Sequence, residues 1–91
     1  MLDKIVKRNE DVAWRMIEGE VIIISPEDST QHYLNEVGSM IWDLADGKRS
    51  VQDIIDHMKK EYQVDEKELA DDVIEFVKNL SSPELKLLIL E

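Results

Sequence analysis

The chain has 91 residues, of which 43% are hydrophobic and 35% are charged, a balance typical of a globular protein rather than a disordered or membrane-spanning one. At this length we expect one domain with a small core, which leaves little room for an enclosed cofactor. The 21 acidic and 11 basic side chains give a formal net charge of −10, and such a balance repels the phosphate backbone of a nucleic acid. Because the sequence contains no cysteine, disulfides, thiolate metal sites and thiol nucleophiles are excluded.

The apolar segments of the sequence are short. Its longest apolar runs, 21–24 and 87–90, are far below the length needed to span a bilayer. The first ten residues alternate charged with apolar side chains and lack the continuous apolar stretch of a secretory signal. We therefore expect a cytoplasmic protein that has no membrane partner.

Residues 12–17 and 20–25 predict two strands joined by a tight connection that contains Gly19. If the turn has two residues, even-numbered positions of the first strand lie opposite odd-numbered positions of the second, and opposed side chains share a face. The face expected to join the core carries Val12, Trp14, Met16, Val21 and Ile23. The other face carries Ile17, Ile22 and Ile24 beside Arg15. A second apolar face needs a cover, which the N-terminal segment, a second copy of the chain or a bound ligand could supply.

A third, short strand is predicted at Thr30–Tyr33, after a turn at Ser25–Ser29 in which proline cannot donate to a sheet ladder. As the last strand of a meander, this segment is expected at an edge of the sheet, with a row of unpaired backbone groups facing outward. We expect this edge to bind a partner.

The first helix is predicted over residues 36–45, with Asn35 as its N-cap and Gly47 beyond its C-terminal end. Gly38 is costly inside a helix, which indicates close packing against another element. Trp42 falls beside the apolar stripe and is expected at the edge of the core. The stripe itself consists of Val37, Met40, Ile41 and Leu44.

Two further helices follow. The second begins at Ser50, where Asp53 completes a variant of the capping box, and the third opens at Asp65 and ends at Ser81–Pro83. The stripe of the second is Val51, Ile54, Ile55, Met58 and Tyr62, and that of the third is Leu69, Val73, Phe76, Val77 and Leu80. The sequence thus predicts an α+β fold, a three-stranded antiparallel sheet followed by three helices, similar to a winged helix-turn-helix. We expect a single domain over 1–91 with its core in 12–80, and an apolar tail at 83–91 that could be a strand or a short helix.

Residues capable of catalysis do not converge in the sequence. His32 and His57 lie on different elements, and neither has a second histidine at metal-ligand spacing. The carboxylates at 65–68 are explained by the favourable macrodipole at a helix N-terminus. We therefore expect no catalytic residues, no metal site and no cofactor.

The stretch Leu34–Gly47 carries the most specific motif of the chain. Leu34-Asn35, Gly38, Ile41-Trp42 and Leu44, followed by Asp-Gly and by a hydroxyl residue at the start of the next helix, resemble the PqqD family over about residues 12–80. This resemblance implies a noncatalytic domain that recognises the leader segment of a ribosomally synthesised precursor peptide. It further implies presentation of that peptide to a modifying enzyme, typically a radical S-adenosylmethionine (SAM) enzyme, as in pyrroloquinoline quinone (PQQ) biosynthesis.

The resemblance also implies a groove between the third helix and the third strand. An extended leader could pair its backbone with the free strand edge and place its apolar side chains against the helix. The residues expected to bind the peptide are Thr30, Gln31, His32, Tyr33 and Leu34 on the strand side and Leu69, Val73, Phe76, Val77 and Leu80 on the helix.

Two other functions stay open. A winged-helix regulator would bind nucleic acid, but the third helix starts Asp65-Glu66-Lys67-Glu68, and the basic residues, including Lys48 and Arg49 in a predicted turn, lie among acids. We therefore expect no nucleic-acid partner. A small assembly subunit would use the second apolar sheet face to form a homodimer or to dock on an enzyme.

Overall fold

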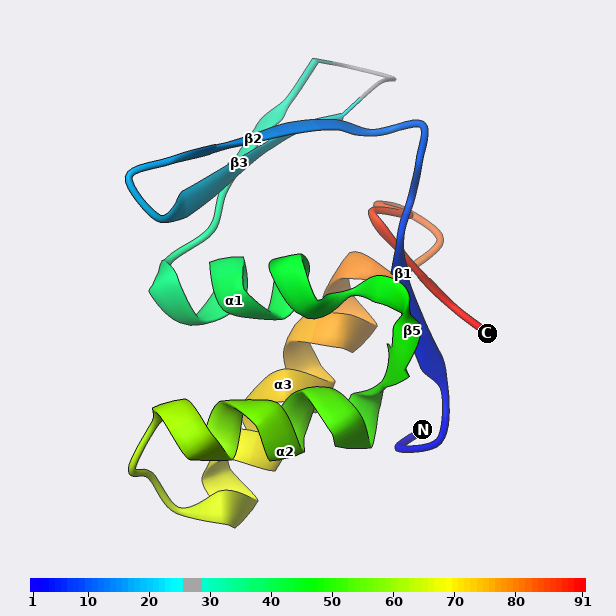
Figure 1. The fold of residues 1–91 in the computed structure, drawn as a ribbon. Coiled ribbons are helices and arrows are strands. Elements are labelled where there is room, and N and C mark those ends of the chain that lie inside the picture. The colour runs from blue at the N-terminus through cyan, green and yellow to red at the C-terminus, as the bar shows by residue number, and fades with distance from the viewer. Residues whose placement is uncertain (26–28) are drawn as a thin grey trace.

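The computed structural model describes residues 1–25 and 29–91, so most of the turn predicted at Ser25–Ser29 lies outside the described residues. The elements in chain order are β1 (Ile5–Arg8), β2 (Ala13–Ile17), β3 (Glu20–Ile24), β4 (Gln31–Tyr33), α1 (Glu36–Leu44), β5 (Asp46–Ser50), α2 (Val51–Glu61), α3 (Glu66–Leu80) and β6 (Leu88–Leu90). Figure 1 shows β2 and β3 lying over α1, with β1 and β5 at the side of the helices. The predicted α+β order of three antiparallel strands followed by three helices is confirmed, and a second three-stranded sheet is added to it.

The β2–β3 hairpin has the register predicted from a two-residue turn. Trp14 lies opposite Ile23, and Met16 lies opposite Val21. The turn residues Glu18 and Gly19 have φ angles of 52° and 83°. Positive φ at both central positions defines the type I′ turn, whose twist matches that of the paired strands.

Burial on the hairpin differs from the prediction. Val21 and Ile23 are fully buried, but Trp14 is 37% and Met16 is 47% exposed, so their assignment to the core was wrong. The reason is the strand order β2-β3-β4, in which the central strand β3 packs against α1 while β2 lies at an edge.

The second sheet joins the two ends of the chain, with the strand order β5-β1-β6. Lys48 and Arg49 therefore lie in a strand, and the turn predicted for them was wrong. The tail forms β6, in which Leu90 pairs with Val6, so the choice between strand and helix is settled in favour of the strand. The core extends beyond the predicted 12–80, since Val6 is completely buried and Leu88 is 2% exposed.

The predicted helix starts are confirmed by their hydrogen bonds. The side chain of Asn35 accepts from the backbone N–H of Gly38 at 2.8 Å. Both bonds of the capping box are present, because Ser50 Oγ accepts from the N–H of Asp53 at 3.1 Å and Asp53 Oδ2 accepts from the N–H of Ser50 at 3.0 Å. Asp65 caps α3 by accepting from the N–H of Lys67.

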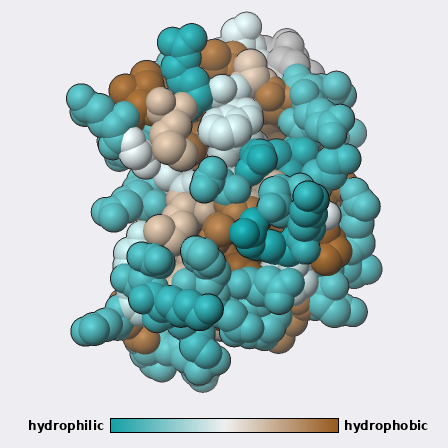
Figure 2. Space-filling view, in the orientation of Figure 1, coloured by the Kyte–Doolittle hydropathy of each residue, from teal (hydrophilic) through white to brown (hydrophobic). Residues whose placement is uncertain are grey.

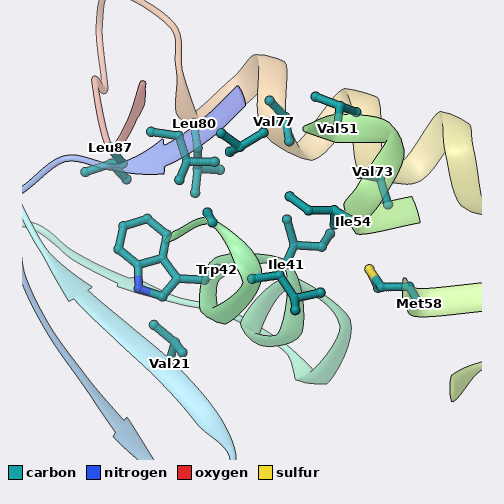
Figure 3. Close-up of a cluster of buried hydrophobic side chains, with 14 of the residues drawn as sticks. Val21, Ile41, Trp42, Val51, Ile54, Met58, Val73, Val77, Leu80 and Leu87 are labelled. Carbon is teal, nitrogen blue, oxygen red and sulfur yellow. The ribbon is translucent and has the colours of Figure 1, made fainter. Parts of the chain in front are cut away.

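Trp42 lies at the centre of the core, not at its edge as predicted, and none of its surface is exposed. Figure 3 shows its ring between Val21 of β3 on one side and Leu80 and Leu87 on the other. One tryptophan thus connects the β2-β3-β4 sheet, α3 and the C-terminal segment. In the part of the chain that the structure describes, no helix is long and apolar enough to cross a membrane.

Candidate functional site

The strand β4 lies at the edge of its sheet, as predicted, and its ladder runs along β3. The N–H of Leu34 donates to the carbonyl of Val21 at 2.9 Å, and the carbonyl of Thr30 accepts from the N–H of Ser25 at 2.8 Å. Backbone groups of an antiparallel edge strand face its neighbour at every second residue. The N–H and C=O groups of Gln31 and Tyr33 therefore face away from β3.

A buried serine fixes this edge to α1. Ser39 is 2% exposed, and its Oγ accepts from the N–H of Val21 at 2.8 Å and donates to the carbonyl of Leu34 at 3.2 Å. The end of β4 is thereby held at one position over the helix. Sequence reasoning missed Ser39, although a serine next to Gly38 on the packed side of a helix could have indicated such a link.

The start of α1 packs closely against α3 and against the end of β4. A Cβ atom at Gly38 would lie 2.9 Å from Phe76 Cε2 and 3.5 Å from Leu34 Cβ. The close packing predicted for Gly38 is therefore confirmed, and its cause is the ring of Phe76. Gly38 is buried, and both Leu34 and the ring of Phe76 lie close to it.

The structure divides the site residues predicted on α3 into two groups. Phe76 is partly buried and lies at the surface of the core cluster. The other four, Leu69, Val73, Val77 and Leu80, are at most 9% exposed and belong to the core. These four side chains therefore present almost no surface to a ligand, and Phe76 is the one predicted site residue of α3 that is partly exposed.

The residues predicted on the strand point to two sides of the sheet. Gln31 and Tyr33 lie opposite Ile24 and Ile22 on the outer face, where Tyr33 is 70% exposed. His32 lies opposite the buried Ile23, and its side chain is half-buried on the inner face. Thr30 is exposed and Leu34 packs against the core. The edge thus brings Gln31 and Tyr33 together on the outer face, while Leu34 and Phe76 both lie close to Gly38.

The outer face of the β2-β3-β4 sheet remains apolar and open. Ile17 is 48% and Ile24 is 40% exposed, and a shallow hollow of about 260 Å³ lies among Ile17, Ile22 and Tyr33. Figure 2 shows hydrophobic atoms at the surface near the top of the view, where β2 and β3 lie. The N-terminal segment, one of the covers considered, pairs instead with β5 and β6.

The pKa shifts of this protein occur away from the edge of β4. Burial raises the pKa of the Tyr62 hydroxyl, and the nearby carboxylates of Glu36 and Glu61 add to the rise. The backbone N–H of Lys48 lowers the pKa of Asp46, with the Arg49 guanidinium contributing in the same direction. Over residues 1–25 and 29–91, no group of three or more His, Cys, Asp or Glu side chains is placed to hold a metal ion.

Fold and site together define a class of small α+β domains in which an uncharged edge strand, β4, is fixed to the first helix through a buried serine. Residues 20–85 match the family model described as coenzyme PQQ synthesis protein D (PqqD), and the chain belongs to this family. The solved structure of TbiB1 in complex with the TbiA(beta) leader peptide is similar, with a TM-score of 0.77, 30% sequence identity and coverage of 87% of this chain and 92% of that one. No match was found among curated proteins.

Proposed function

We propose that this protein binds the leader segment of a ribosomally synthesised precursor peptide as an additional strand along β4. The observation that carries the proposal is the outward-facing backbone of Gln31 and Tyr33 on the uncharged edge strand β4. Membership in the PqqD family and the similarity to TbiB1, which was solved with a leader peptide, support it.

In the proposed complex, backbone pairing contributes affinity and side-chain contacts contribute selectivity. A strand added to Gln31 and Tyr33 gains main-chain hydrogen bonds, each with a net contribution of about 0.5–1.5 kcal/mol, whatever the leader's sequence. Selectivity then depends on alternate side chains. Those that point inward meet Leu34 and Phe76, and those that point outward lie beside Tyr33.

The proposal assigns recognition and not chemistry to this chain. The bound leader would be presented to a separate modifying enzyme, and the family resemblance suggests a radical SAM enzyme. The open outer face, with Ile17, Ile24 and Tyr33 exposed, favours one further partner there, either this enzyme or a second copy of the chain. The nucleic-acid regulator gains no support, since α3 begins with two acids in its first turn, Glu66 and Glu68.

A titration followed by amide NMR tests the proposal. The probes are synthetic peptides that cover the N-terminal segments of short open reading frames found beside the gene of this protein, and the controls are the same peptides with scrambled sequences. We expect the largest shifts at residues 31–34 and in the turn of α3 around Phe76, because added hydrogen bonds and ring contacts both change amide environments. Shifts confined to α2 and β5 would contradict binding at this edge.

A further inference from the structure

The strand β6 forms a second open edge of this protein, in the sheet β5-β1-β6. Ile5 and Glu91 exchange two backbone hydrogen bonds, at 3.0 and 2.9 Å. Because bonding alternates along an antiparallel pair, the N–H and C=O groups of Leu88 and Leu90 face away from β1. In the part of the chain that the structure describes, no backbone group pairs with them there. These outward-facing groups are therefore open to a further strand.

The sequence of β6 lacks the features that protect an edge from pairing. It reads Leu-Ile-Leu, with no charged residue and no proline. Ile89 is 40% exposed, on the face opposite the buried Leu88. The nearest charges along the chain lie outside the strand, at Lys86 before it and Glu91 after it. The edge is therefore apolar along the strand and oppositely charged at its two ends.

Such an edge is complementary to a copy of itself. In an antiparallel pair the start of one strand lies beside the end of the other, so Lys86 of each copy comes near Glu91 of the second copy. Neither side chain takes part in an ion pair among residues 1–25 and 29–91. When Ile89 lies opposite Ile89 of the second copy, Leu88 of each strand pairs with Leu90 of the other. This register gives every outward-facing group of β6 a partner.

We propose that two copies of this chain associate through β6, antiparallel and about a two-fold axis at Ile89, so that their β5-β1-β6 sheets join into one. Figure 1 shows the C-terminal end of the chain at the periphery of the molecule, where a second copy can approach. The proposal does not depend on leader binding, because β4 lies in the other sheet and keeps its open edge. A strand of three residues makes a small interface, so the dimer should be weak and should dissociate on dilution.

Disulfide crosslinking tests this arrangement, because the chain contains no cysteine of its own. Opposed residues at a non-hydrogen-bonded position of an antiparallel pair have Cα atoms about 4.5 Å apart, a distance that a disulfide spans. Ile89→Cys in the full chain should therefore form a covalent dimer on oxidation at high protein concentration. The matched control is Ile24→Cys, which replaces an isoleucine that is also 40% exposed, in the other sheet.

We expect the dimer yield of Ile89→Cys to exceed that of Ile24→Cys about tenfold, because pairing through β6 raises the local concentration of one thiol beside the other. Equal yields, or a higher yield with Ile24→Cys, would overturn association through β6.

Sedimentation equilibrium of charge variants gives the second measurement. Each charge reversal changes the net charge by two, so Lys86→Glu takes it from −10 to −12 and Glu91→Lys takes it from −10 to −8. Both variants should weaken self-association about threefold or more, because each places like charges together at both ends of the interface. The double variant, Lys86→Glu with Glu91→Lys, should restore the wild-type association.

Stronger association of Glu91→Lys would mean that net charge, and not antiparallel pairing of the strand ends, governs the dimer, and would overturn the proposed register. A wild type that is monomeric at every concentration would overturn the interface itself. A foreign peptide that shifts the amides of residues 88–91, when raising the concentration of the protein does not, would likewise show that β6 pairs with another partner. Each of these results would leave leader recognition at β4 in place.

Discussion

Two edge strands of this protein, β5 and β4, carry side chains of different character. The β5 edge includes Asp46, Lys48 and Arg49, whereas β4 consists of Gln31, His32 and Tyr33 and contains no Lys, Arg, Asp or Glu. Charged side chains, lysine above all, protect an edge from pairing with a foreign strand. The difference teaches that the chain protects the β5 edge with charge and leaves the β4 edge able to accept a strand.

The largest effect on stability is expected from a substitution in β6, where the β5-β1-β6 sheet contributes side chains to the core. Leu88→Ala removes most of a side chain that is 2% exposed and should lower the free energy of unfolding by about 2–5 kcal/mol. Urea denaturation measures this loss. The control Ile89→Ala truncates the next residue, which is 40% exposed on the opposite face of β6, and should cost far less.

The comparison of the two sheets also predicts that Leu88→Ala leaves recognition intact. At temperatures where the variant is folded, its leader affinity should stay within about twofold of the wild type, since Leu88 and β4 belong to different sheets. A large loss of affinity in a folded Leu88→Ala variant would show that the two sheets are not separate in function.

A substitution by proline in the edge strand β4 should have an intermediate effect, which is on leader affinity. Tyr33→Pro removes an N–H that faces away from β3 and puts the proline ring in the path of an added strand, so leader affinity should fall about tenfold or more. The temperature of thermal unfolding should change little, because every N–H group that β4 donates to β3 is still present. The control Tyr33→Ala removes only the side chain. If both variants bind the leader equally, backbone pairing at β4 is wrong.

Features of the fold that depend on residues close together in the sequence could be predicted, and features that depend on distant residues could not. The caps at Asn35 and Ser50, and the hairpin register around Gly19, are set by residues within a few positions of one another. The β5-β1-β6 sheet pairs Val6 with Arg49 and with Leu90, and such distant partners leave no periodic signal in a strand of three to five residues. A turn was therefore predicted at Lys48 and Arg49, because their charge gave no indication of a strand.

The site was predictable to a similar degree. The β4 edge follows from the meander, and Phe76 follows from the apolar stripe of α3. Which border of that stripe faces β4 depends on how the helix packs, so Leu69 and Val77 were expected in the groove but lie in the core. The exposure of Trp14 likewise depends on which strand α1 covers.

The smallest effect on stability is expected from Asp46→Asn in the charged edge strand β5. Asp46 Oδ1 accepts from the N–H of Lys48 at 3.0 Å, and Oδ2 pairs with the Arg49 guanidinium at 2.6 Å, so its pKa in the folded protein lies below its unfolded value. A lowered pKa means that the ionised carboxylate contributes stability above the unfolded pKa and loses it as the pH falls through the folded value.

The wild type should therefore be slightly more stable than Asp46→Asn at pH 7, and the two should converge as the pH is lowered below about 4. Urea denaturation at a series of pH values measures the difference. The control Asp71→Asn makes the same change of charge at an exposed position without an ion pair, so it measures the effect on stability at pH 7 of losing one negative charge alone. A constant difference between wild type and Asp46→Asn at every pH would mean that packing, and not the ionised carboxylate, holds Lys48 and Arg49 on this edge.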